Sequence, residues 1–124
     1  MASMGTIGVQ IPPNQAVSGV VDLGANDLIA FEMPESWAGT ALTFQSKANN
    51  VDDEQATPED WDDVYDDTGT EVSVTVAAGR IVVVGTATKA AIGALRYLRI
   101  RSGTAAAPVN QNPAKEIRII TKGR

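Results

Sequence analysis

The spacing of apolar residues constrains the fold of this chain more than any other feature of its sequence. Val72, Val74 and Val76 alternate with Ser73 and Thr75, and this period of two places one set of side chains on each face of a β-strand. Similar runs recur along the chain, and 11 glycines and 6 prolines interrupt them every several residues. Because continuous segments of helix length are scarce, the sequence predicts an all-β fold.

We expect about 7 to 8 short strands in an antiparallel β-sandwich or jelly roll. The run 81–84 is apolar without alternation, which predicts burial on both of its faces. One short helix is expected near residues 88–94, and a second candidate helix lies at 58–62, with Thr57 as N-cap and Pro58 at the first helical position. The expected strands cover residues 17–22, 28–33, 41–46, 70–76, 81–84, 95–101 and 116–121.

The length of 124 residues favours a single domain. We assign residues 1–14 to an N-terminal arm and residues 15–124 to the sandwich, with an acidic loop at 49–67. The chain has no cysteine and no histidine, so disulfides, thiolate nucleophiles and the commonest general base are excluded. Neither a signal peptide nor a membrane helix is expected, because no basic N-terminal region precedes an apolar stretch and no apolar run approaches the required length.

The charges are strongly divided along the chain. The net charge is −5, yet residues 1–79 hold 14 acids and one base, while residues 80–124 hold nine bases and one acid. Nine of the acids lie between Asp52 and Asp67. With a pI near 4.5 and only Tyr97 interleaved among the arginines of the basic half, nucleic acid is not an expected partner.

The acidic stretch has the ligand chemistry of a calcium site, but it lacks the spacing of one. An EF-hand loop that started at Asp63 would place Tyr65 at its third position and Thr68 at its sixth, where an acid and a glycine are required. We therefore predict no metal and no cofactor, and interpret the stretch as a solvated or partner-facing loop. Crowded carboxylates also provide a chance glycosidase pair, but no enzyme is predicted.

Aromatic and basic residues near these acids are the candidate interaction residues. Trp61 and Tyr65 stand inside the acidic stretch, as in a carbohydrate-binding platform, although a core role for both rings, as for Trp37 and Phe44, is the more common use of aromatic residues. The arginines of residues 95–101 are expected to pair with the chain's own acids or with those of a neighbouring subunit. The candidates are Asp60, Trp61, Asp62, Asp63, Tyr65, Arg96, Arg99 and Arg101.

One local structure is well specified within the acidic stretch. The sequence Asp66-Asp67-Thr68-Gly69 is typical of a tight turn. It predicts a hairpin that joins residues 61–65 to the strand at 70–76.

Taken together, several segments resemble a group of small virion proteins of tailed bacteriophages. These segments are VSGVVDLG at 17–24, MPESW at 33–37, ALTFQS at 41–46, WDDVYDD at 61–67, and LRYLRIRSG at 95–103 followed by PVNQ at 108–111. The resemblance implies a β-sandwich that decorates or cements the head, or serves at a head fibre or tail, and it brings no catalytic residues. The sequence departs from the group in a longer acidic insertion at 50–60. The motif LRYLRI is also similar to the penultimate strand of discoidin-type jelly rolls, which often bind glycans.

The expected function is accordingly that of a non-enzymatic structural protein, made in the host cytoplasm and assembled into the virion. Its expected partners are copies of itself, with a trimer favoured, and the major capsid protein or another virion protein. The acidic loop of one copy would face basic residues of another, on the strand 95–101 or among Lys115, Arg118 and Lys122. The alternative is a carbohydrate-binding module that contacts host glycans through Trp61 and Tyr65. Neither reading predicts a membrane partner.

Overall fold

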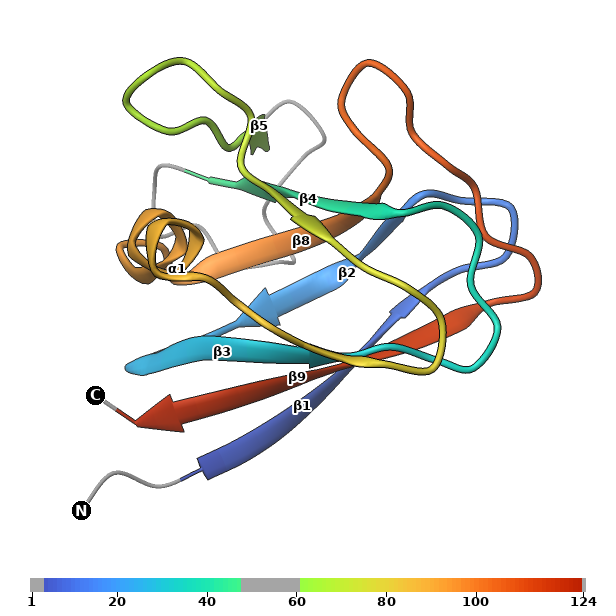
Figure 1. Ribbon diagram of the computed structural model, residues 1–124, viewed down its shortest axis with the longest axis horizontal. Helices are drawn as coiled ribbons and strands as arrows, with labels where there is room; N and C mark the ends of the chain where they lie inside the picture. Colours follow the sequence, from blue (N-terminus) through green and yellow to red (C-terminus); the bar gives the residue numbers. More distant parts are fainter. Residues whose placement is uncertain (1–3, 48–60, 124) are drawn as a thin grey trace.

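A computed structural model describes residues 4–47 and 61–123, which form two antiparallel β-sheets packed against each other (Figure 1). The predicted all-β sandwich is therefore confirmed. In chain order the elements are β1 (Met4–Ile11), β2 (Val17–Asp22), β3 (Asn26–Glu32), β4 (Ala41–Ser46), β5 (Asp62–Asp63), β6 (Ser73–Thr75), β7 (Ile81–Val83), α1 (Thr86–Gly93), β8 (Tyr97–Ser102) and β9 (Lys115–Gly123).

The two sheets divide these strands unequally. The four-stranded sheet has the order β1-β9-β3-β7, and the five-stranded sheet has the order β2-β8-β4-β5, with β6 also paired to β4. Phe31 of β3 and Phe44 of β4 meet between the sheets with ring centroids 6.0 Å apart. Leu98 and Ile100 of β8 are fully buried in the same core, as their alternation in sequence predicts.

Residues 4–11 correct the division of the chain into an arm and a sandwich. They form β1, which pairs with β9 along its whole length, from Met4 opposite Lys122 to Ile11 opposite Lys115. Val9 and Ile11 face the core with the same period of two as the other strands. Gly5 and Gly8 weaken the strand signal in the sequence, but pairing with β9 overrides this low propensity.

In β2 a bulge changes the expected alternation. The register with β8 shifts between Val17 and Val20, so Ser18 and Val21 are the two buried residues. The Ser18 hydroxyl accepts a hydrogen bond from the Ile100 amide at 2.9 Å, so this buried polar group has a hydrogen-bond partner.

The structure contradicts the expected burial of residues 81–84 on both faces. β7 pairs only with β3 among the described residues, and Ile81 and Val83 are 61% and 76% exposed. A lone apolar run predicts a central strand, but here the strand lies at an edge of the sheet, where only the side of Val82 and Val84 packs against the core.

The helix predictions have two outcomes. The helix expected near 88–94 is present as α1, which starts two residues earlier and buries Ile92 against the core. Of the second candidate, residues 58–60 lie outside the described residues, and Asp62 belongs to β5 rather than to a helix.

Candidate functional site

The outer face of the five-stranded sheet gathers most of the charged and aromatic residues that the sequence singles out. Gln45 of β4 pairs with Asp63 on one side and Arg99 on the other. Thr43, two residues earlier and on the same face, pairs with Arg101. Because side chains alternate along strands, Arg99 and Arg101 lie on this outer face while Leu98 and Ile100 enter the core.

Arg101 is the centre of a buried ion-pair network on this face. Its side chain is 7% exposed, and it donates hydrogen bonds to Asp63 at 2.7 Å and to Glu71 at 2.9 Å. Its Nε atom donates to the Thr43 hydroxyl at 3.0 Å, and that hydroxyl donates to the Gly103 carbonyl at 2.8 Å. Arg101 thus fastens the hairpin that carries both acids onto the sheet through two charged hydrogen bonds, of which the arginine end is buried and the carboxylate ends are partly exposed.

The ion pair changes the titration of Asp63. The hydrogen bond from Arg101 holds the pKa of the Asp63 carboxyl below its ordinary value, against the opposing effect of partial burial. A general acid at neutral pH needs the opposite shift, a raised pKa. Asp63 therefore serves Arg101 as a counter-ion.

This shift predicts an acid-sensitive contribution to stability. Because the folded-state pKa is depressed, the contribution is complete above the unfolded-state value of about 4 and is lost as the pH falls through the lower folded-state value. We expect Asp63→Asn to flatten the acid limb of stability measured by urea unfolding from neutral to strongly acidic pH. The matched control is Asp67→Asn, at an exposed turn position, which should leave the wild-type limb unchanged; identical curves for all three proteins would contradict the assignment.

Cations and aromatic rings alternate beside this network. Ser46 pairs with Asp62 and with Leu98, so the next residue, Lys47, comes between Trp61 and Tyr97. The Lys47 Nζ atom lies 4.6 Å from the Tyr97 ring centroid and 5.3 Å from that of Trp61. The outer members of this ladder are Arg99, whose Cζ atom is 4.4 Å from the Trp61 centroid, and Arg96, 5.0 Å from the Tyr97 centroid. Each contact is a cation–π interaction that holds the strands together through their side chains.

Arg96 is also paired within the chain. Its guanidinium donates to Asp22 through Nε at 3.0 Å and Nη2 at 3.3 Å, and this hydrogen bond lowers the pKa of Asp22 against the opposing effect of burial. Both side chains are about half exposed, so the pair adds little stability.

The hairpin predicted at residues 61–76 is confirmed. Tyr65 bridges to Glu71, and Gly69 takes a φ of 82°, a conformation that glycine adopts without strain. The Asp66 carboxylate accepts hydrogen bonds from the Thr68 hydroxyl and from the backbone N–H groups of Thr68 and Thr70. These bonds, with the Thr68 hydroxyl first, lower the pKa of Asp66, and they fix the turn.

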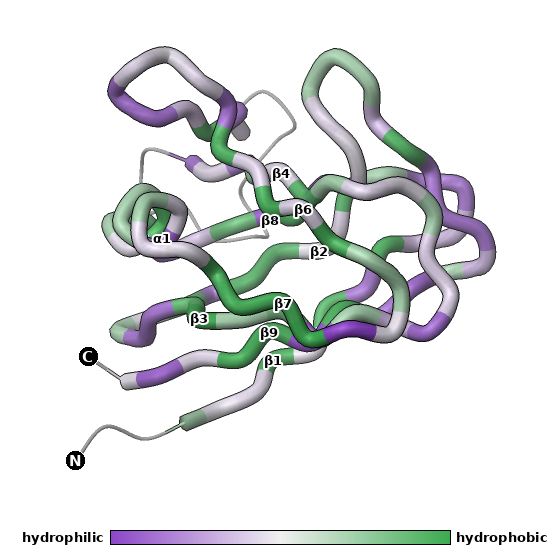
Figure 2. Tube along the Cα trace, in the orientation of Figure 1, coloured by the Kyte–Doolittle hydropathy of each residue, from purple (hydrophilic) through white to green (hydrophobic). Residues whose placement is uncertain are grey.

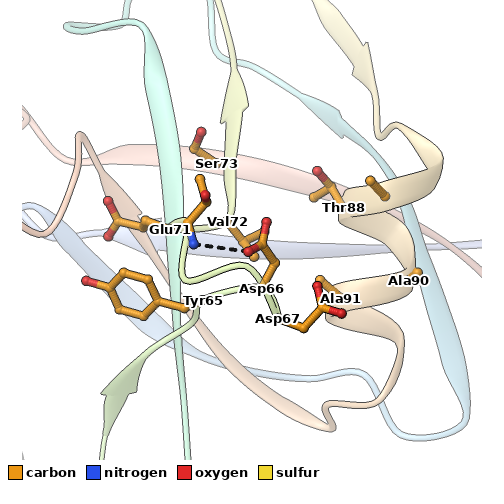
Figure 3. Close-up of a pocket in the computed structure, with 11 residues that line it drawn as sticks. Tyr65, Asp66, Asp67, Glu71, Val72, Ser73, Thr88, Ala90 and Ala91 are labelled. Carbon is orange, nitrogen blue, oxygen red and sulfur yellow. Dashed lines mark hydrogen bonds between the residues drawn. The ribbon is translucent and has the colours of Figure 1, made fainter.

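A pocket of about 640 Å³ lies between this hairpin and α1 (Figure 3). Tyr65, Asp66 and Glu71 form the hairpin side, and Thr88 and Ala91 belong to the helix side. The Tyr65 ring is 53% exposed. Such a surface offers hydroxyls, carboxylates and one aromatic face to a ligand.

The structure brings together part of the predicted site. Arg101 and Asp63 are joined, Trp61 is 6% exposed beneath Arg99, and Asp60 lies outside the described residues. The expected core position of Phe44 is confirmed, and Trp37 packs partly buried against the core. Trp61 is buried as expected, but it lies beneath cations on the outer face of the sheet and not in the core cluster between the sheets. The expected core position of Tyr65 is wrong, because this residue is 53% exposed.

Sequence reasoning missed several residues that lie beside or bind the predicted arginines. The missed residues share the outer face with them, and their signal was the alternation of β4, in which Thr43, Gln45 and Lys47 fall opposite the buried Leu42 and Phe44. Two further missed partners, Asp22 and Glu71, come from elements distant in sequence.

Comparison with known protein families, with curated proteins and with solved structures finds no match for this chain. Within the described ranges, no three carboxylates gather closely enough to hold a metal ion. No helix among the residues described has the length and apolar content to cross a bilayer.

Proposed function

We propose that this protein is a non-enzymatic structural component of a tailed-phage virion, where it decorates or cements the capsid by binding copies of itself and the shell. The observation that carries the proposal is the exposure of Ile81 and Val83 on β7, an edge strand without a charged residue. The virion setting rests on the sequence resemblance, and the mode of association rests on this edge.

Two features of the four-stranded sheet support association through its edges. Apolar residues continue from β7 across the sheet, because Val83 pairs with Ala30 of β3 and Ala30 pairs with Ile120 of β9; Figure 2 shows β7 and part of β9 in green. The opposite edge, β1, is eight residues long and carries no charge or proline. Monomeric sheets usually protect such edges with charges or prolines.

An interface between different edges fits a closed ring. If β7 of one copy contacts β1 of the next, the contact is heterologous, and a heterologous contact closes when the rotation between copies permits it. The trimer that we propose is the smallest such ring. Burial of Ile81 and Val83 would contribute about 2 kcal/mol for each side chain.

The charged surfaces support this choice indirectly. Arg101 is already bound to Asp63 and Glu71, and Arg96 is bound to Asp22. Pairing of the acidic loop with Arg96 or Arg101 of another copy would have to displace these contacts. Contact between the apolar edges would displace no ion pair within the described residues.

The double variant Ile81→Lys/Val83→Lys tests the proposal. Both side chains are exposed, so the variant should fold normally while charge repulsion and lost apolar burial dissociate the oligomer, with a loss of at least about tenfold in association constant. Sedimentation velocity measures the assembly state, and co-sedimentation with emptied capsids measures shell binding. Ala106→Lys, at an exposed loop position, is the matched control and should behave as wild type; a wild-type monomer that ignores capsids would defeat the proposal.

A carbohydrate-binding module is the second candidate, favoured by the exposed Tyr65 ring at the pocket beside α1. The buried Trp61 cannot serve as a stacking platform, so Tyr65 takes that role. On a glycan array, Tyr65→Ala should abolish binding and Tyr65→Phe should retain most of it, since stacking needs the ring and not the hydroxyl. A silent array with wild-type protein would eliminate this candidate.

A further inference from the structure

The backbone of β7 directs the hydrogen-bonding groups of two residues away from the rest of the sheet. In an antiparallel pair, residues whose N–H and C=O groups face the partner strand alternate with residues whose groups face the other side. The Arg80 carbonyl at one end of β7 and the Val84 N–H at the other end both hydrogen-bond to the β3 side of the sheet, each at 2.9 Å. The backbone groups of Ile81 and Val83 therefore point outward.

The same alternation, followed across the sheet, describes the opposite edge. In β3, the residues whose backbone groups do not face β7 face β9, among them Ala30 opposite Ile120. The backbone groups of Ile119, the next residue of β9, therefore face β1, where Ile119 pairs with Ile7. It follows that the N–H and C=O groups of Thr6 point out of the sheet, as do those of residues 4, 8 and 10.

The residues with outward backbone groups also carry exposed apolar side chains. Met4 of β1 and Ile81 of β7 are each 61% exposed, and Val83 is 76% exposed. These are three of the four exposed large apolar side chains in the described part of the chain. All three lie on the outer face of the sheet, because their neighbours along the strand, such as Val9 and Val82, pack on the core side. Strand pairing at these edges would therefore satisfy backbone groups and bury apolar side chains together.

The strand directions fit a continuous sheet between copies. Neighbours in the order β1-β9-β3-β7 are all antiparallel. A second copy in the same orientation consequently places its β1 antiparallel to β7, and the alternation continues across the contact. Neither strand contains a charged residue or a proline, which are the usual protections against such pairing.

We propose that β7 binds β1 of a second copy as an added strand, through main-chain hydrogen bonds at Ile81 and Val83. The inference rests on the association proposed above and specifies how the two edges bond. In this mode of recognition, main-chain hydrogen bonds supply affinity and the side chains select the register. With Val83 opposite Met4 and Ile81 opposite Thr6, the exposed apolar side chains of the two strands lie together.

Hydrogen exchange of the backbone amides, followed by NMR at low and high protein concentration, tests the pairing. We expect the amides of Thr6 and Val83 to exchange rapidly in the monomer and at least about tenfold more slowly in the oligomer. The amides of Ile7 and Val82 face strands of the same chain and should be protected in both states. Rapid exchange of Thr6 and Val83 in an oligomer would overturn the inference, although the proposed association through side chains would stand.

Substitutions at position 6 test the same bonds by sedimentation velocity. Thr6→Pro removes an N–H that points out of the sheet, so the monomer should fold while association weakens at least about tenfold. Thr6→Ala keeps this N–H and should associate as the wild type does. Ile7→Pro removes an N–H that faces β9, so it should instead destabilise the monomer in urea unfolding.

Two results would contradict the inference in different ways. Undiminished association of folded Thr6→Pro would overturn the strand pairing alone. A wild-type protein that stays monomeric at every concentration would remove the proposed association, and the strand pairing with it.

Discussion

Replacement of Arg101 by methionine is expected to lower the free energy of unfolding by about 3 kcal/mol. Methionine keeps much of the arginine's length but removes every donor, so Asp63 and Glu71 lose their charged partner while they remain on the hairpin packed against the sheet. The Thr43 hydroxyl also loses the hydrogen bond from Arg101. Chemical denaturation at neutral pH measures the change.

Two further variants distinguish loss of the network from loss of any arginine. Arg118 also contacts two acids, Glu32 and Glu116, but its side chain is 57% exposed, so Arg118→Met should cost only about 0.5 kcal/mol. The triple variant Asp63→Asn/Glu71→Gln/Arg101→Met should recover part of the lost stability, because it leaves no carboxylate without its charged partner. Equal effects of Arg101→Met and Arg118→Met would contradict the buried network.

A comparable loss, about 3 kcal/mol, is expected from Gly103→Ala. Gly103 takes a φ of 87°, which costs an alanine about 1 kcal/mol or more. A Cβ atom there would also lie 2.5 Å from the Ala107 carbonyl oxygen and 2.8 Å from the Val109 nitrogen. Both are backbone atoms, so relief of the clash requires the loop itself to move.

The matched control for this prediction is Gly24→Ala. Gly24 has a φ of 58°, yet a Cβ atom there meets nothing within 4 Å, so only the conformational cost of about 1 kcal/mol applies. Thermal or urea unfolding of the two variants compares them directly. If both lost the same stability, the close approach of the backbone at Gly103 would be without energetic consequence.

Alternation in the sequence was sufficient to predict much of the sandwich. β4 spans the residues expected for it, and the Asp66–Gly69 turn forms as its residue types indicate. Two strands needed information beyond local pattern. Gly5 and Gly8 weaken the signal of β1, which pairs with β9 along its whole length. Nothing in residues 81–84 distinguishes an edge strand from a central one.

The sequence predicts on which face of the strand the candidate arginines lie, but it does not predict which residues bind them. Alternation placed Arg99 and Arg101 on one side of their strand, as the structure confirms. The acids that bind Arg101 come from a hairpin, and their selection depends on the pairing of β4 with β5 and β6, which no local pattern determines. The sequence left open whether the arginines pair with the chain's own acids or with those of a neighbouring subunit, and Arg96 and Arg101 pair within the chain.

The central claim is that copies of this protein associate through the apolar edges of the four-stranded sheet and not through their opposite charges. Sedimentation velocity of the wild-type protein in low and high sodium chloride tests it most directly, because salt screens contacts between charged surfaces and leaves apolar burial intact or strengthened. The account predicts an oligomer whose association constant is unchanged or higher at high salt. An oligomer that dissociates as salt rises, or a monomer in both solutions, would contradict it.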